Sequence, residues 1–170
     1  MRSPSNDESK QKLFMELYTS CEQPFLKYCR GLSSTLDDAK DLASESVLIV
    51  YYNLDRLKKL ESFRAYLFGV ARRLKLNQYR RKKFQGEYNE KEATKVYSQE
   101  PPPDINSDIR LLYELLNKLP LKQKEAFLLF ELSGFSLKEI QALQGGTLAA
   151  VKSRLRKARV QLRLWLNDDV

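Results

Sequence analysis

Apolar residues recur every three or four positions over much of this chain, which is the spacing of one buried face of an α-helix. The alternation of apolar and polar residues that is typical of β-strands does not stand out in any segment. The buried stripes are Leu13, Leu17 and Leu26; Ala43, Val47, Val50, Leu54 and Leu57; Phe63, Leu67, Val70 and Leu74; and Leu148, Val151, Leu155, Ala158 and Leu162. This pattern predicts an all-α fold.

A polar segment at residues 86–106 interrupts the helical pattern. Its three consecutive prolines, from Pro101 to Pro103, cannot continue a helix and favour an extended chain. At about 20 residues it is longer than most connections within a compact domain. We therefore expect two helical domains joined by a flexible linker: an N-terminal helical bundle at residues 8–85 and a C-terminal helix-turn-helix domain at residues 107–168.

Local signals predict where the helices begin and end. In the first domain we expect a helix at 8–32 that Pro24 kinks or splits, a second beginning near Thr35, and a third at 60–84. In the second domain we expect helices at 109–118, 120–133, 136–144 and 147–166. Thr35 and Ser136 each stand three positions before an acidic residue, as in a capping box. The Gly145-Gly146 turn before a longer basic helix indicates a helix-turn-helix.

The net charge of +8 is unevenly distributed along the chain. The segments 56–83 and 147–163 hold 17 of the 30 Lys and Arg residues, but only Glu61 of the 22 acidic residues. The remainder has 13 basic against 21 acidic residues. Two positive segments on an otherwise acidic protein indicate two contacts with a polyanion.

The residue types exclude several classes of function. The absence of histidine excludes a Ser-His-Asp triad, a Cys-His dyad and most zinc sites, but leaves open an enzyme that uses only Asp, Glu, Lys or Ser. From the sequence as a whole, we expect a protein with no catalytic residue, metal or cofactor. No stretch approaches the apolar length of a membrane span, and the polar N-terminus does not resemble a signal peptide. We therefore expect a cytoplasmic protein without membrane insertion, in which Cys21 and Cys29 are reduced and buried.

The second expected helix has an outer face that is acidic at one end and apolar at the other. Acidic residues near a helix N-terminus complement the helix dipole, but this does not explain two large apolar residues below them. We therefore expect this face to bind a protein. Its residues are Asp38, Asp41, Glu45, Leu48 and Tyr52.

The third expected helix carries cations interleaved with aromatic residues. Cations neutralise phosphates and aromatic rings stack on unpaired bases, so we expect this face to bind a nucleic-acid strand. A merely solvated basic helix end is the alternative, especially for residues 80–83. The face consists of Arg64, Phe68, Arg72, Lys75, Tyr79 and Lys82.

The last expected helix carries a second basic face. In a helix-turn-helix, the N-terminal part of this helix meets base edges in the major groove, and its later cations are placed for phosphates. A C-terminal helix that merely packs is the alternative. The expected DNA-binding residues are Lys152, Ser153, Arg154, Arg156, Lys157, Arg159 and Arg163.

Four segments in a fixed order resemble the extracytoplasmic-function group of sigma factors. Residues 38–45 resemble its acidic polymerase-binding motif, and residues 62–72 resemble its promoter-melting helix. Residues 119–129 resemble the opening of its C-terminal domain, and residues 151–159 resemble its recognition helix. The resemblance covers residues 17–166 apart from the linker. Ser44, Gln141 and Gly146 depart from the residues usual in the family, which are glutamine, a small residue and an apolar residue.

The resemblance implies partners and roles. The Asp38-to-Tyr52 face is expected on the coiled coil of the largest subunit of core RNA polymerase. The turn with Arg56, Lys58 and Lys59, and the helix after it, are expected to capture an unpaired base of the minus-ten promoter element. The C-terminal domain is expected to bind the minus-thirty-five element and the flap of the second-largest subunit. The linker is expected to pass near the RNA path, and an anti-sigma protein is an expected partner.

Two other readings fit parts of the sequence. One is a two-domain helix-turn-helix regulator that does not bind core polymerase as a sigma factor. Duplex binding alone has no use for stacking aromatics, which disfavours it. The other is a recombinase with a helix-turn-helix tail, but its catalytic α/β domain needs strands, and none is indicated before Gly86.

Overall fold

The computed structural model describes residues 4–84 and 107–168 of the 170-residue chain. Within these two ranges the chain forms helices and turns and contains no β-strand, which confirms the expected all-α fold. The expected linker at 86–106 lies outside the described residues. None of the described helices combines the length and apolar character needed to cross a bilayer.

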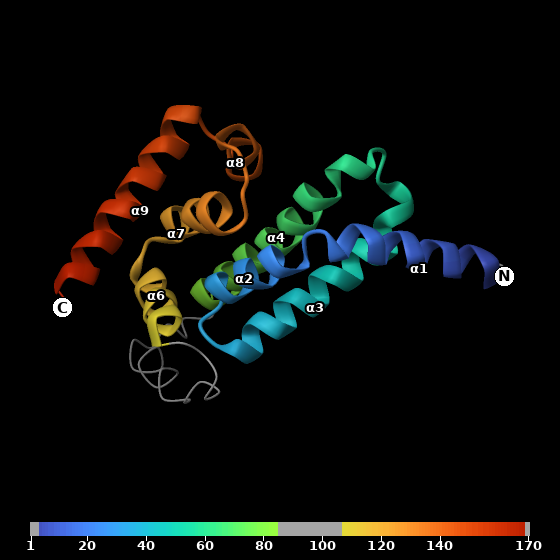
Figure 1. The fold of residues 1–170 in the computed structure, drawn as a ribbon, viewed down its shortest axis with the longest axis horizontal. Helices are drawn as coiled ribbons and strands as arrows, with labels where there is room; N and C mark the ends of the chain where they lie inside the picture. The colour runs from blue at the N-terminus through green and yellow to red at the C-terminus, as the bar shows by residue number, and fades with distance from the viewer. Residues whose placement is uncertain (1–3, 85–106, 169–170) are drawn as a thin grey trace.

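The N-terminal bundle consists of α1 (Pro4–Thr19), α2 (Glu22–Leu32), α3 (Leu36–Asn53) and α4 (Phe63–Phe84), with 3₁₀ turns at Leu54–Arg56 and Leu60–Ser62. Helices α2, α3 and α4 lie side by side, and α1 extends from one end of them (Figure 1). The first expected helix is split, but at Ser20 and Cys21 rather than at Pro24. Pro24 is the third residue of α2, where a backbone N–H has no intrahelical partner to lose.

The C-terminal unit consists of α6 (Ser107–Lys118), α7 (Leu121–Phe127) with a π-helical continuation at Leu128–Leu132, α8 (Leu137–Gln144) and α9 (Leu148–Asp168). The Ser136–Glu139 capping box is confirmed, with both of its hydrogen bonds present. Gly145 and Gly146 turn the chain between α8 and α9 with φ of 77° and 81°. The expected helix-turn-helix arrangement is therefore present.

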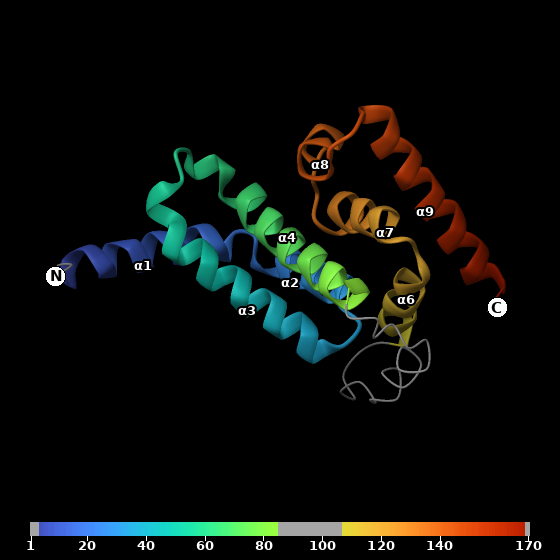
Figure 2. The same cartoon turned by 180° about the vertical axis from the view of Figure 1, so that it is seen from behind.

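A buried seam joins the N-terminal bundle to the C-terminal unit. We call it the interdomain seam, and it lies where α2 and α4 pack against α7, its π-helical continuation and α8 (Figure 2). Phe68 of α4 lies at its centre, with ring centroids 5.4 Å from Phe25 and 4.8 Å from Phe135. Gly31 of α2 approaches Leu128 so closely that a Cβ atom there would overlap the leucine side chain. One hydrophobic core therefore runs through both parts.

Candidate nucleic-acid interface

The acidic and apolar face of α3 lies open to solvent. Asp38, Asp41 and Glu45 are exposed, Leu48 is 55% exposed and Tyr52 is 70% exposed. The opposite side of α3 packs on α2 and α4 through Leu42, Ala43 and Val50, among others. The Thr35 hydroxyl caps the helix by accepting from the Asp38 N–H at 3.1 Å. The expected protein-binding face is thus a continuous exposed surface, on the side of α3 away from those packed residues.

Phe68 is not on an exposed face, and the expectation that it is available to stack on a base is wrong for this arrangement. Its side chain is 0% exposed and packs among Phe25, Tyr28 and Phe135. Helix α4 is buried on two sides, by α2 and α3 and by the C-terminal unit. Phe68 therefore also belongs to the core, although it lies outside the expected buried stripe of this helix.

Two of the expected DNA-binding arginines are held by the C-terminal unit. Arg72 Nε donates to Glu125 Oε1 at 2.7 Å, in an ion pair whose side chains are 15% and 3% exposed. Arg64 Nη1 donates to the Ser133 carbonyl at 3.3 Å, and its guanidinium lies 4.0 Å from the centroid of the Phe135 ring. The guanidinium groups that would bind a phosphate or a base of DNA are thus already occupied by groups of the C-terminal unit.

Two lysines are buried in the same seam. Lys75 of α4 is 8% exposed and Lys124 of α7 is 4% exposed. Burial, and then the charge of Lys75, lower the pKa of Lys124 to about 8. Burial is also the main cause that lowers the pKa of Lys75. Burial therefore disfavours the protonated, charged form of both lysines in this arrangement.

The rest of the expected minus-ten surface stays accessible. Arg56, Lys58 and Lys59 are exposed in the turn between α3 and α4, and Tyr79 is 39% exposed. The expected surface is thus divided. Its central part, from Arg64 to Lys75, lies in the interdomain seam, and its two ends face solvent.

The basic face of α9 remains largely exposed. Lys152, Arg156, Lys157, Arg159 and Arg163 are exposed, whereas Ser153 and Arg154 are half-buried. Arg159 Nε donates to Glu131 Oε1 at 2.7 Å, on the side of α9 that faces the π-helical segment. The expected minus-thirty-five face is therefore accessible in this arrangement apart from Ser153 and Arg154.

Arg154 is linked to Arg72 by a chain of side-chain hydrogen bonds. Arg154 Nη1 donates to Gln144 Oε1 at 3.0 Å. Gln144 Nε2 donates to Glu125 Oε1 at 2.9 Å, and this is the oxygen that also accepts from Arg72. Glu125 and Gln144 were not among the expected site residues. Glu125 is an acidic residue that is only 2% exposed. The sequence does not show that it is buried, because its partner Arg72 is distant in the chain.

The two unusual residues of the helix-turn-helix form a pair. Gln141 Nε2 donates to the Gly146 carbonyl at 3.1 Å. Gly146 has a φ of 81°, a left-handed conformation that residues with a Cβ rarely adopt. A small residue at position 141 has no such donor, so the two departures from the family pattern stabilise one turn together.

Two protein families match this chain. The family described as Sigma-70 region 2 matches residues 17–85, and the family described as Sigma-70, region 4 matches residues 109–162. The sigma factor EcfG of Rhodopseudomonas palustris is 30% identical over 139 residues, which cover 82% of this chain and 77% of that protein. The chain belongs to the extracytoplasmic-function group of the sigma-70 family. It is therefore a sigma factor, which binds core RNA polymerase and directs promoter recognition and transcription initiation.

Further relatives of this sigma factor support the same family. The ferric citrate uptake sigma factor FecI of Escherichia coli is 30% identical over 133 residues, covering 76% of each protein. The sigma factor RpoE of Bartonella quintana, solved in complex with the anti-sigma factor NepR, aligns with a TM-score of 0.72 and 26% identity. That alignment covers 96% of this chain and 99% of that one. The region 2 match decides against the alternative of a regulator with an unrelated first domain.

Proposed function

We propose that this sigma factor works through three surfaces that are used in sequence. The outer face of α3 docks on the largest subunit of core polymerase. The face of α4 then holds the opened non-template strand of the minus-ten element. The start of α9 reads the minus-thirty-five duplex, and the C-terminal unit also contacts the flap of the second-largest subunit.

The exposure of Leu48 and Tyr52 carries the docking proposal. Isolated apolar side chains on a protein surface are ordinary, but these two lie one turn apart, next to Asp41 and Glu45 on the same face. An apolar centre with charges at its edge is the composition of a protein interface. The acids would meet basic residues of polymerase, and the two apolar side chains would be buried on binding.

We further propose that the described arrangement is a closed form that must open before α4 binds DNA. The carboxylate of Glu125 on Arg72 and that of Glu139, 3.4 Å from Arg64, take the place that phosphates would occupy. Strand binding by these arginines therefore requires the C-terminal unit to leave α4. Because the docking face of α3 is already exposed, polymerase can bind first and separate the two parts.

The remaining parts of the proposal concern regulation by an anti-sigma protein and the cellular location. The neighbouring solved structure of RpoE is a complex with an anti-sigma factor. We extend this kind of partner to the present chain, with stabilisation of the closed form as its simplest action. Sigma factors act by binding, and we place this one in the cytoplasm as a protein without catalysis, cofactor or metal.

Removal of the docking face tests the proposed function. We expect Asp41→Lys combined with Leu48→Ala to abolish co-purification with core polymerase, because it reverses one charge and removes an apolar anchor. Glu16→Lys combined with Met15→Ala is the matched control, since it makes the same kinds of change on α1, where Met15 is 51% exposed. Circular dichroism should show both proteins folded. Undiminished polymerase binding by the α3 variant would reject the docking assignment.

A further inference from the structure

A cavity of about 330 Å³ lies where α2, the start of α3 and α6 meet, apart from the three surfaces described above. Its walls are mostly apolar and include Leu26 of α2 and Leu36 and Ala39 of α3. The ring of Tyr113 from α6 also lines it. This volume is at the lower end of the range of small-molecule sites, about 300–1,000 Å³. The cavity therefore has the size and the lining to hold the apolar part of a small ligand.

All charged residues that line the cavity are basic. They are Lys27, Arg30, Lys40 and Arg110. Arg110 is paired with Glu114 at 3.0 Å. Within the described part of the chain, neither Arg30 nor Lys40 has a carboxylate at salt-bridge distance. An apolar cavity with unneutralised cations at its rim is complementary to an amphiphilic anion.

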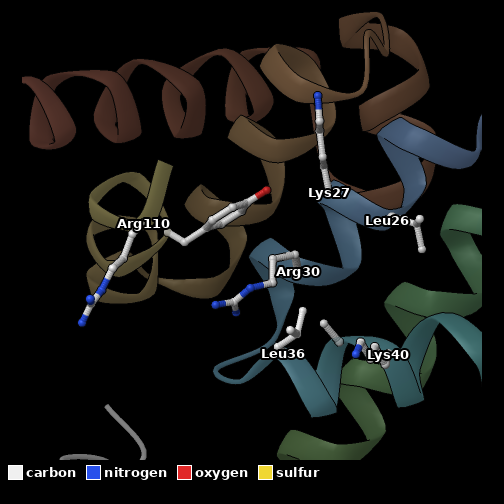
Figure 3. Close-up of a pocket in the computed structure, with 8 residues that line it drawn as sticks. Leu26, Lys27, Arg30, Leu36, Lys40 and Arg110 are labelled. Atoms are coloured by element: carbon white, nitrogen blue, oxygen red, sulfur yellow. The ribbon is translucent and has the colours of Figure 1, made fainter. Parts of the chain in front are cut away.

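The side chains of the rim do not all point the same way. Arg30 extends from α2 towards the side of α6 that carries Arg110, while Lys40 stands on α3 beyond Leu36 (Figure 3). Lys27 extends away from both, so its stem forms part of the wall and its ammonium lies apart (Figure 3). The Arg30 guanidinium lies 5.3 Å from the centroid of the Tyr113 ring. Arg30 is thus placed to receive a negatively charged head group, and Lys40 adds a second positive charge to the rim on the other side of Leu36.

We propose that this cavity binds a small amphiphilic carboxylate, with its hydrocarbon tail against Leu26, Leu36 and Ala39 and its carboxylate at Arg30, while the charge of Lys40 adds to the attraction at the rim. A partner helix would instead need an extended groove for a row of side chains at helical spacing. Here eight residues from three helices surround one small space. That shape fits a short tail with one head group.

Such a ligand would bind the closed form selectively. Arg110 and Tyr113 belong to the C-terminal unit, and the other lining residues belong to the N-terminal bundle, so the cavity is complete only when the two parts are together. A ligand that binds one of two forms shifts the population towards that form. The carboxylate would therefore oppose opening and reduce initiation. This last step rests on the proposed closed form, but the binding itself does not.

Calorimetry with decanoate and the full chain tests the site. Decanoate should bind, and octanoate should bind more weakly by about 4-fold for each buried methylene that it lacks. Decyltrimethylammonium, which has the same tail and the opposite charge, should not bind. Equal binding of the two decyl probes, or no binding of decanoate, would overturn the proposal.

Three variants locate the head group. Arg30→Gln should weaken decanoate binding by about 10-fold or more, because a charge-assisted contact is lost. Lys40→Gln should weaken decanoate binding as well. Because this variant leaves the Arg30–Tyr113 contact intact, it still tests the site if Arg30→Gln disturbs the fold. Lys27→Gln is the matched control, which keeps the affinity because its ammonium points away. Equal losses in all three variants would indicate a diffuse attraction and contradict the assigned site.

Transcription separates this inference from the proposed function. Decanoate should reduce initiation by the unaltered chain with core polymerase, and should have less effect on the Lys40→Gln variant. Specific binding without any effect on initiation would overturn the regulatory step. A failure of the chain to support initiation without decanoate would count against the proposed function and not against the site.

Discussion

At the scale of single residues, Phe68 contributes most to the interdomain seam. It is fully buried, and its ring contacts aromatic rings from both α2 and the C-terminal unit. Tyr79 lies three helical turns further along α4 and is 39% exposed. The two aromatics therefore have different roles although both stand among cations.

Truncation of these two side chains should separate their roles. We expect Phe68→Ala to lower the free energy of unfolding by about 3–5 kcal/mol, because it leaves a cavity in a packed core. Tyr79→Ala should cost about 1 kcal/mol or less, as is usual for a partly exposed position. Urea denaturation of the full chain measures both. Similar small costs would place Phe68 outside the core.

Lys124 makes stability depend on pH. Its pKa is about 8 in the folded chain, against 10.5 as its ordinary value, so the unfolded chain binds more protons between these two pH values. The cost of burying the charge is therefore complete below pH 8 and disappears as pH rises towards 10.5. Its size is on the order of 3 kcal/mol, since one pKa unit corresponds to about 1.4 kcal/mol.

Replacement of Lys124 by methionine should remove this dependence. We expect Lys124→Met to exceed the parent chain in stability below pH 8, with the difference shrinking as pH approaches 10.5. The comparison with the parent chain cancels the opposite contribution of buried thiols such as Cys29, whose pKa burial raises to about 12. Lys122→Met, at an exposed position of the same helix, should give a flat difference. A flat difference for Lys124→Met would contradict the proposed cause.

At the scale of elements, the helix caps are predicted correctly from sequence and the packing partners are not, while the break expected at Pro24 lies three to four residues earlier. The Thr35 and Ser136 caps depend on residues three positions away, so they could be predicted. The seam on α4 depends on contacts more than 50 positions away, such as that of Arg72 with Glu125. The periodicity of α4 does not reveal that the C-terminal unit packs on its other side, which is why the sequence predicts an exposed Phe68. The helix-turn-helix and the exposed face of α3 needed no such partner.

The turn between α8 and α9 offers a test at this scale. We expect Gly146→Ala to lower stability by about 1–2 kcal/mol, since its φ of 81° is unfavourable for any residue with a Cβ. The cost comes from the backbone, because the nearest atom to that Cβ would be Arg154 Nη2 at an ordinary 3.5 Å. Gly69→Ala is the matched control, which should gain about 0.5–1 kcal/mol inside α4. Thermal unfolding of both variants decides the sign of each effect.

At the scale of the whole molecule, the closed arrangement separates the two proposed steps of initiation. It leaves the face of α3 exposed and buries the central part of the α4 face. The buried Arg72–Glu125 pair and the Lys75–Lys124 approach have opposite effects on the seam. The first holds it together, while the second costs free energy, mainly because both charges are buried and also because Lys75 repels Lys124. A seam of this composition is suited to separate when polymerase binds.

A reversible crosslink across the interdomain seam tests the central claim most directly. A Cβ atom at Gly69 of α4 would lie 3.5 Å from Leu143 Cδ2 of α8, so Gly69→Cys with Leu143→Cys places two thiols across the seam, and non-reducing electrophoresis shows whether they form a disulfide. Permanganate footprinting of promoter thymines with core polymerase then reports strand opening by the oxidised and the reduced protein. The unaltered chain under the same oxidant is the control, because its own cysteines are buried. We expect strand opening to be lost on oxidation and to return on reduction, whereas equal opening by the crosslinked and reduced proteins would contradict the claim that the C-terminal unit must leave α4.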